Sequence, residues 1–187
     1  MQEKNSSPYF LKLYGFSFNI IMLKCEPMQN KKIKTIIFDF NETLISGEGD
    51  KIVVYPHILD LLKNLKEQGK TLYLWTLRGR TSTLQIMKEQ MLLSYFTNVY
   101  CGTDIFPKPS IQGLMTIIPS WEPSEMLMIG DGFHDMQGAK NIGCKCIGVL
   151  WNGLGGEKIL QDLGANFLAH TPLDCLQHIK VLEESHV

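Results

Sequence analysis

Residues 35–44 read TIIFDFNETL, an apolar run that stops at the carboxylate of Asp39. The β-branched and aromatic residues of this run predict a buried strand over 34–39. A similar stretch reads MLMIGDGFHD over 126–135 and places Asp131 directly after a second apolar run. Since ligands of open α/β sheets bind at the carboxyl ends of the strands, both carboxylates are expected beside one crevice.

The rest of the chain alternates apolar runs with helical periodicity, which is typical of a parallel sheet covered by helices. Strands are expected over 34–39, 72–76, 98–101, 126–130, 144–150 and 166–169. Helices are expected over 57–68, 134–142 and 157–163. Three more helices are expected to begin at Ser82, at Ser110 and after Pro172. The pattern predicts an α/β fold, a Rossmann-like three-layer sandwich with a mainly parallel sheet.

Two of these helices carry finer predictions. Ser82 is expected to cap the N-terminus of the second helix, because a hydroxyl there can accept a backbone N–H. The spacing of apolar residues places Met91 on the buried face of that segment and Met115 on the buried face of the helix from Ser110.

The composition favours one domain and excludes few functions. The chain has 187 residues, enough for one sizeable core. Its 18 Lys+Arg and 19 Asp+Glu give a net charge of −1, so no overall charge favours nucleic acid or anionic membranes. Five cysteines show no zinc spacing and no Cys-x-x-Cys pattern, which favours reduced core thiols in a cytoplasmic protein.

Residues 1–33 are interpreted as an N-terminal extension of uncertain role, before a domain over 34–187. The apolar stretch 9–23 is interrupted by polar residues and is too short to span a membrane. It also lacks a basic start and a small-residue cleavage site, which argues against a secretory signal. A strand or helix flanking the sheet is favoured over membrane-surface attachment, and translation from Met28 is a further alternative.

The two strand-end carboxylates predict a metal-dependent site. Asp39 and Asp131 repel each other unless a cation lies between them, and hard oxygen ligands favour Mg²⁺. One oxygen of Asp39 could then attack phosphorus and form an aspartyl-phosphate. Thr76 ends a strand with a hydroxyl that can donate to a phosphoryl oxygen, and Lys108 between two prolines can neutralise the developing charge.

These residues resemble the motifs of the haloacid dehalogenase-like (HAD) superfamily of phosphohydrolases. The first motif is similar to residues 39–44, the second to Thr76, the third to Lys108-Pro109 and the fourth to Gly130-Asp131 with Asp135; the similarity covers roughly residues 34–180. The resemblance implies a Rossmann-like sheet in which the strands before Asp39 and Asp131 are neighbours. It also implies that Asp39 is the nucleophile and that Mg²⁺ is bound by Asp39, the Asn41 carbonyl and Asp131, with Asp135 as direct or outer support.

The first motif departs from this family at Asn41, where the phosphatases usually carry Asp. That Asp protonates the leaving group and later activates water, whereas an amide cannot transfer a proton usefully. General acid–base help is worth about 10²–10⁴-fold, so turnover is expected to be slow or specialised. Glu42 could supply a substitute acid, although Glu in a loop is more often solvated.

Three functions fit these residues. The first is a phosphatase whose leaving groups need little protonation, such as acyl or aryl phosphates, or whose proton comes from Glu42, His134 or water. The second is an inactive relative that binds Mg²⁺ and a phosphorylated ligand as an interaction module. The third is a dehalogenase, which needs no metal and is disfavoured by the acidic fourth motif.

The spacing between motifs leaves no room for a separate cap domain. Thirty-one residues separate Leu44 from Thr76 and are used by a flap near 46–54, a helix and a strand. A capless site is open to a phosphorylated small molecule or macromolecule and can be closed by a partner subunit. Arg78 and Arg80 are candidates to grip a substrate anion, with solvated loop charges as the equal alternative. 

Overall fold

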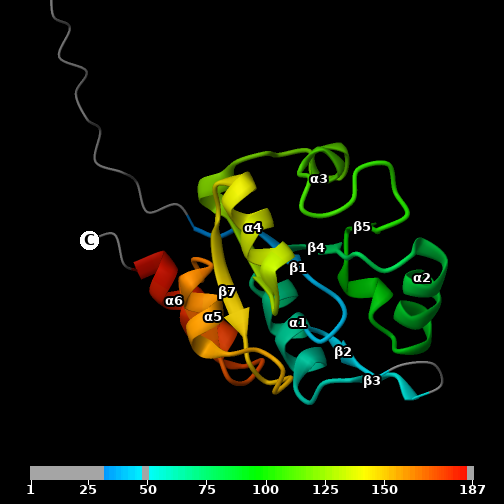
Figure 1. The fold of residues 1–187 in the computed structure, drawn as a ribbon, viewed down its shortest axis with the longest axis horizontal. Helices are drawn as coiled ribbons and strands as arrows, with labels where there is room; N and C mark the ends of the chain where they lie inside the picture. Colours follow the sequence, from blue (N-terminus) through cyan, green and yellow to red (C-terminus); the bar gives the residue numbers. More distant parts are fainter. Residues whose placement is uncertain (1–31, 48–50, 185–187) are drawn as a thin grey trace, which may run out of the picture.

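A six-stranded parallel sheet forms the centre of the molecule (Figure 1). The computed structural model describes residues 32–47 and 51–184 of the chain. The strand order is β5-β4-β1-β6-β7-β8, with β1 Thr35–Phe38, β4 Thr71–Trp75, β5 Asn98–Tyr100, β6 Met126–Gly130, β7 Lys145–Val149 and β8 Phe167–Ala169. Each expected strand is present, and the predicted α/β fold is confirmed.

Strand β1 lies in the middle of the sheet, between β4 and β6. Phe38, its last residue, is opposite Leu74 on one side and Ile129 on the other. The backbone N–H of Asp39 then donates to the carbonyl of Ile129 at 2.9 Å. The expectation that the strands before Asp39 and Asp131 are neighbours is therefore correct.

Helices cover both faces of the sheet and give three layers. They are α1 Ile58–Glu67, α2 Arg80–Glu89, α3 Gln112–Ile117, α4 Phe133–Ile142, α5 Glu157–Asp162 and α6 Asp174–Glu184. Buried residues of α1, α2 and α6 belong to one hydrophobic cluster, and those of α3, α4 and α5 belong to another. Strand β1 contributes Ile36 and Phe38 to the first cluster and Ile37 to the second, since side chains alternate along a strand.

A small hairpin follows β1 where the flap was expected. Its strands β2 Ile45–Ser46 and β3 Val53–Val54 pair antiparallel. Among the described residues between β1 and β4, this hairpin and α1 are the only helices and strands. The described part of this interval therefore contains no separate cap domain.

Three of the finer helix predictions are wrong. Gly79 caps α2, and Ser82 lies inside the first turn, where its hydroxyl donates to the Gly79 carbonyl at 3.1 Å. Met91 follows the end of α2 with a φ of 57° and is 71% exposed. Met115 is 53% exposed, because α3 is short and buries Gly113 and Leu114 instead.

Other expectations fall partly outside the described residues. All but the last two residues of the N-terminal extension lie there, and so does Cys25. The four cysteines that are described are free thiols, and Cys101, Cys146 and Cys175 are buried. Within residues 32–47 and 51–184, none of the helices has the length and apolar character needed to cross a membrane.

Candidate active site

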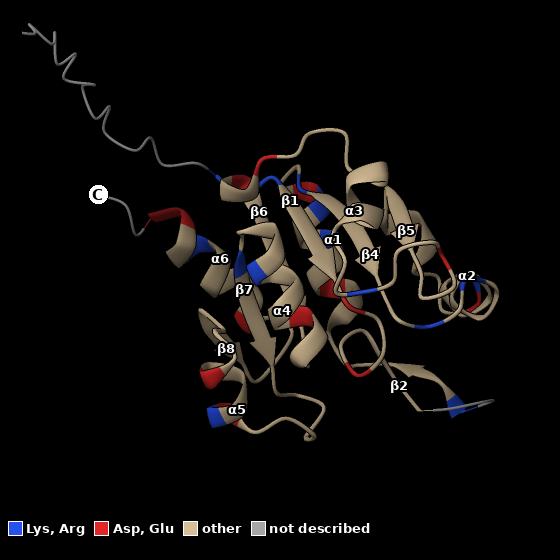
Figure 2. Cartoon of the chain, turned by 45° about the horizontal axis from the view of Figure 1, so that its top comes forward, with Lys and Arg blue, Asp and Glu red and all other residues tan. Residues whose placement is uncertain are grey.

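Three carboxylates meet at the carboxyl ends of β1 and β6. Asp39 follows β1, Asp131 follows β6, and Asp135 lies in the first turn of α4. Each offers an oxygen within 4.8 Å of the others. Acidic segments lie near the ends of these central strands in Figure 2. The parallel pairing of β1 with β6 explains why residues more than ninety positions apart form one cluster.

Lys108 is the cation of this cluster. Its side chain is 1% exposed, and its Nζ donates to Asp39 Oδ1 and to the Trp75 carbonyl, both at 2.8 Å. The same ammonium forms an ion pair with Asp135 Oδ1. Its Nζ also lies 5.2 Å from the centre of the Trp75 ring, within the range of a cation–π contact. Lys108 therefore links the end of β4 to two carboxylates.

Asp135 is fixed by close backbone packing. Its Oδ2 accepts the Gly132 N–H at 2.9 Å. A Cβ at Gly130 would lie 2.3 Å from Asp135 Cγ, so only glycine fits where β6 ends. The Gly-Asp-Gly sequence thus lets the α4 carboxylate lie against the strand end, beside Asp131.

The cluster shifts the pKa values of its members. Burial raises the pKa of Asp39 to about 8, against the opposing charge of Lys108 and with help from the Asp135 charge. Burial also raises the pKa of Asp131 to about 6. Desolvation acts to lower the pKa of Lys108, but Asp135 and Asp39 outweigh it and raise that pKa. Desolvation of these carboxylates thus outweighs the stabilisation that one ammonium gives to their charged forms.

This arrangement fits a magnesium ion. Three hard carboxylate oxygens within 4.8 Å, with no His or Cys among them, are the donor set that Mg²⁺ prefers. A divalent cation would favour the ionised forms of Asp39 and Asp131, whose burial otherwise disfavours them. The chemistry of the donor set therefore agrees with the expected metal.

The cluster forms the floor of a pocket of about 400 Å³. The pocket is lined by Asp39, Asn41, Glu42, Thr76, Leu77, Arg78, Lys108, Asp131, Gly132, His134 and Asp135. Every residue predicted for catalysis or metal binding is in this set, and so is Arg78, whereas Arg80, the other candidate for substrate binding, is not. A larger pocket of about 750 Å³ has a separate lining that includes Ile33, Cys144 and Leu163 and none of these residues.

Thr76 and Arg78 lie where the sequence predicts substrate contacts. Thr76 follows β4, is 2% exposed, and its hydroxyl oxygen accepts the Arg78 N–H at 3.1 Å. The hydroxyl proton is therefore available for a phosphoryl oxygen. The Nε of Arg78 donates to Ser82 Oγ at 3.2 Å, which directs the side chain along the wall of the pocket.

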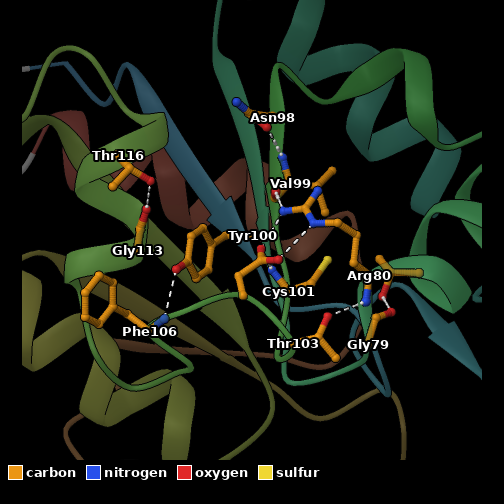
Figure 3. A network of polar contacts seen from close by, with 12 residues as sticks. Gly79, Arg80, Asn98, Val99, Tyr100, Cys101, Thr103, Phe106, Gly113 and Thr116 are labelled. Carbon is orange, nitrogen blue, oxygen red and sulfur yellow. Dashed lines mark hydrogen bonds and ion pairs between the residues drawn. The ribbon is translucent and has the colours of Figure 1, made fainter.

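Arg80 has a structural role, contrary to both interpretations of its charge. Its guanidinium donates to the carboxylate of Asp104 and to the Val99 carbonyl, the latter at 3.0 Å (Figure 3). Asp104 also accepts the Cys101 N–H at 2.8 Å. The bonds hold the loop after β5 against the start of α2. The Arg80 side chain is absent from the pocket lining.

The first-motif loop is held by partners that sequence reasoning missed. Tyr55 donates to Glu42 Oε2 at 2.6 Å, so Glu42 is a bound wall residue rather than a solvated one. Asn152 donates to Asp131 Oδ2 at 3.1 Å and to the Glu42 carbonyl at 3.0 Å. Thr43 Oγ1 donates to Asp131 Oδ1 at 3.3 Å. Only Thr43 had a sequence signal, its place in the motif; the others depend on loop packing.

Curated relatives of the chain include phosphatases of small molecules. It is 26% identical over 129 residues to a phosphoglycolate phosphatase of Synechococcus elongatus, covering 69% of this chain and 60% of the relative. It is 34% identical over 110 residues to a phosphoglycolate phosphatase of Vibrio vulnificus, covering 57% and 48%. It is 23% identical over 163 residues to the pyrophosphatase PpaX of Bacillus anthracis, covering 84% and 74%. The chain thus spans about half to three fifths of the length of the first two relatives.

Solved structures share the fold. A haloacid dehalogenase-like family hydrolase from Streptococcus pneumoniae matches 78% of this chain and 98% of its own, with 19% identity and a TM-score of 0.68. A HAD-superfamily hydrolase from Ehrlichia chaffeensis matches 81% and 98%, with 20% identity and a TM-score of 0.65. The model of the family described as haloacid dehalogenase-like hydrolase matches residues 2–149. The chain therefore belongs to the haloacid dehalogenase-like hydrolase family.

Proposed function

We propose that the protein is a Mg²⁺-dependent phosphohydrolase that acts through an aspartyl-phosphate on Asp39. The observation that carries this proposal is the position of Asp39, whose carboxylate lies 2.8 Å from Lys108 Nζ and within 4.8 Å of the Asp131 and Asp135 oxygens. A carboxylate in this place contacts a neighbouring cation and lines a pocket, and a bound divalent cation would favour its ionised, nucleophilic form.

Seven of the pocket residues have a role in the proposed reaction. The Thr76 hydroxyl and the Arg78 side chain bind phosphoryl oxygens, and Lys108 stabilises the charge that develops on them. Asp39 attacks phosphorus and the leaving oxygen departs; water then releases the phosphate from Asp39. Asp39, Asp131, Asp135 and the Asn41 carbonyl would hold Mg²⁺, which supplies Lewis-acid neutralisation of the phosphoryl group.

Phosphate monoesters are the proposed substrates. The names of two relatives support this class, since phosphoglycolate is a phosphate monoester; the pyrophosphatase PpaX is named for the hydrolysis of a phosphoanhydride instead. Among the described residues, the segment between β1 and β4 holds a small hairpin and α1 rather than an inserted domain, which leaves the pocket open to larger phosphorylated molecules. The assignment of phosphate monoesters as the substrate class is part of this proposal.

Asn41 favours a second candidate function, a phospho-ligand binding module without turnover. Its Oδ1 is buried and has no hydrogen-bond partner among the described residues, and an amide cannot exchange protons with a leaving group or with water. A binding module needs the metal, Thr76 and Lys108 but no acid–base group. The same site would then retain phosphate without hydrolysing esters.

Phosphatase assays on p-nitrophenyl phosphate separate the two candidates. The native protein is expected to release phosphate with Mg²⁺ and to lose this activity with EDTA. Asp39→Asn removes the nucleophile and is expected to lower the rate by at least about 10³-fold, in line with the loss of a covalent catalyst. Glu67→Gln, an exposed change on α1, is the matched control and should have native activity.

Two results would contradict the phosphatase. Equal rates for native protein and Asp39→Asn would place any activity outside this site. Inactivity of the native protein, combined with metal-dependent binding of inorganic phosphate in calorimetry, would support the binding module instead.

A further inference from the structure

Asn41 limits the leaving groups that the pocket can release. It lies two residues after Asp39 on the pocket wall and offers an amide, which has no proton to give to a departing oxygen. Glu42, its neighbour, has one carboxylate oxygen bound by the Tyr55 hydroxyl at 2.6 Å. Lys108 is bound by Asp39, Asp135 and the Trp75 carbonyl. The position two residues after Asp39 therefore supplies no transferable proton, which favours leaving groups that depart as anions.

Aryl and alkyl esters differ strongly in this step. A phenoxide has a conjugate acid of pKa about 10, as in the tyrosine side chain. An alkoxide is close in basicity to hydroxide, whose conjugate acid, water, has a far higher pKa than a phenol. An unassisted departure is therefore easier for an aryl ester by several powers of ten, and a site without an acid selects for it.

Exposed apolar side chains lie beside the same pocket. Leu77 lines it and is 48% exposed. Phe133 is 53% exposed and lies between Gly132 and His134, which both line the pocket. The Phe133 ring meets the His134 ring edge-on with centroids 5.5 Å apart. Leu77 lies in the loop after β4 and lines the pocket, whereas Phe133 begins α4 next to two lining residues and is not itself in the lining.

We propose that the site is specific for aryl phosphate monoesters, with the ring of the leaving group packed on Leu77 and Phe133. This inference rests on the proposed phosphatase function. An oxygen of Asp39 forms a bond to phosphorus, the bond from phosphorus to the aryl oxygen breaks, and the phenoxide takes a proton from solvent. Water then bonds to phosphorus, the Asp39–phosphorus bond breaks, and both water protons leave with the product as dihydrogen phosphate.

Three ester probes separate ring binding from departure of the leaving group. Phenyl phosphate has the ring and an aryl oxygen, benzyl phosphate has the ring and an alkyl oxygen, and phosphoglycolate has an alkyl oxygen and no ring. The native protein should turn over phenyl phosphate at least about 10²-fold faster than benzyl phosphate, with similar KM values for the two. Asn41→Asp should raise kcat for benzyl phosphate by about 10²-fold or more and change phenyl phosphate much less.

Leu77→Ala and Phe133→Ala test the ring contact. Each should raise KM about five- to twentyfold for both ring-bearing esters, through lost apolar burial, and leave kcat close to native. The KM for phosphoglycolate should stay unchanged. The matched control is Ile159→Ala on α5. It removes a side chain that is 63% exposed and absent from the pocket lining, and it should leave KM and kcat unchanged for all three esters.

The outcomes distinguish this inference from the proposed function. If the native protein hydrolyses phosphoglycolate or benzyl phosphate as fast as phenyl phosphate, the phosphatase stands and aryl specificity is overturned. Unchanged KM values in Leu77→Ala and Phe133→Ala would also overturn it. If neither the native protein nor Asn41→Asp hydrolyses any of the three esters, the phosphatase proposal fails and the inference falls with it.

Discussion

Lys108 is the residue whose charge makes the cluster of carboxylates stable without a metal. Its ammonium contacts Asp39 and Asp135, and its side chain is almost fully buried. Burial of a carboxylate is costly unless a cation or hydrogen-bond donors lie close to it. Lys108 therefore contributes to folding as well as to the proposed catalysis, and the two contributions can be measured separately.

Lys108→Met removes this charge and keeps the length of the side chain. We expect the free energy of unfolding without metal to fall by about 3 kcal/mol, because Asp39 and Asp135 stay buried without a cation. Added Mg²⁺ should recover part of this loss, since it supplies the missing positive charge. Urea unfolding with and without Mg²⁺ measures both effects. Lys63→Met, at an exposed position on α1, is the control. Equal free energies of unfolding for the two variants would contradict the expectation.

The residues that bear chemistry could largely be predicted from the sequence. Asp39, Thr76 and Asp131 follow apolar runs, and the parallel strand order brings such strand ends to one edge, whereas Lys108 was predicted from its place between two prolines. The residues that position them could not be predicted. Asn152 lies in a loop with no periodicity, and its contact with Asp131 depends on how two distant loops pack.

At the scale of elements, the contact between α2 and the loop after β5 positions two sides of the pocket. Arg80 at the start of α2 binds Asp104 in that loop, and the Arg78 carbonyl accepts the Gly102 N–H at 2.9 Å. The loop continues to Lys108, while Arg78 lines the pocket from the other side. The Arg80–Asp104 ion pair therefore links the start of α2 to the loop after β5, and both segments lead to residues of the pocket.

Asp104→Asn is expected to lower the free energy of unfolding by about 1 kcal/mol at pH 7, a modest value because Arg80 is partly exposed. Hydrogen bonds from Arg80 lower the pKa of Asp104 below its ordinary 3.8. This contribution is therefore complete above the ordinary pKa and is lost as the pH falls through the lowered folded value.

Chemical denaturation at pH 7 and near pH 2 measures the difference between native protein and Asp104→Asn. The difference should be present at pH 7 and close to zero near pH 2. A difference that persists unchanged at low pH would show that the ionised carboxylate is not its source. Asp60→Asn on α1 controls for the removal of an exposed carboxylate.

The helices and strands could be predicted because the apolar periodicity reports burial directly. Ile58, Leu61, Leu62 and Leu65 are all fully buried on α1, as their spacing predicts. Predictions near helix ends were less accurate. The Gly79 cap moves the start of α2 before Ser82, and Met91 follows the end of the helix in a left-handed conformation that turns it to solvent. Such end geometry depends on backbone dihedrals, which periodicity does not specify.

At the scale of the whole molecule, the sheet and its two helical layers end in one open edge that holds the proposed metal site. The proposed metal ligands follow β1 and β6 and lie in the first turn of α4, and Asp39 is distant in the sequence from Asp131 and Asp135. An unfolded chain does not bring these carboxylates together. A metal bound here therefore stabilises the folded state by mass action.

Mg²⁺ at ten times its dissociation constant should add roughly 1.4 kcal/mol to the free energy of unfolding. For a chain of this size, that corresponds to a rise in Tm of about 3–6 °C. Thermal unfolding followed by circular dichroism, over a range of Mg²⁺ concentrations, measures the effect. Asp131→Asn should reduce the rise strongly, whereas Asp162→Asn, an exposed change on α5, should keep it. The absence of any rise in the native protein would argue against a metal site.

The Lys108 contact with Trp75 places a fluorescent side chain next to the site. The Trp75 ring is fully buried, with the Lys108 ammonium 5.2 Å from its centre. Trp151 donates its indole N–H to the Thr43 carbonyl at 3.0 Å, in the loop that follows Asp39. Two of the three tryptophans in the chain therefore lie against the pocket-forming segments. Any ligand that redistributes charge around Lys108 acts directly on an indole, so intrinsic fluorescence can follow binding to this protein without an attached dye.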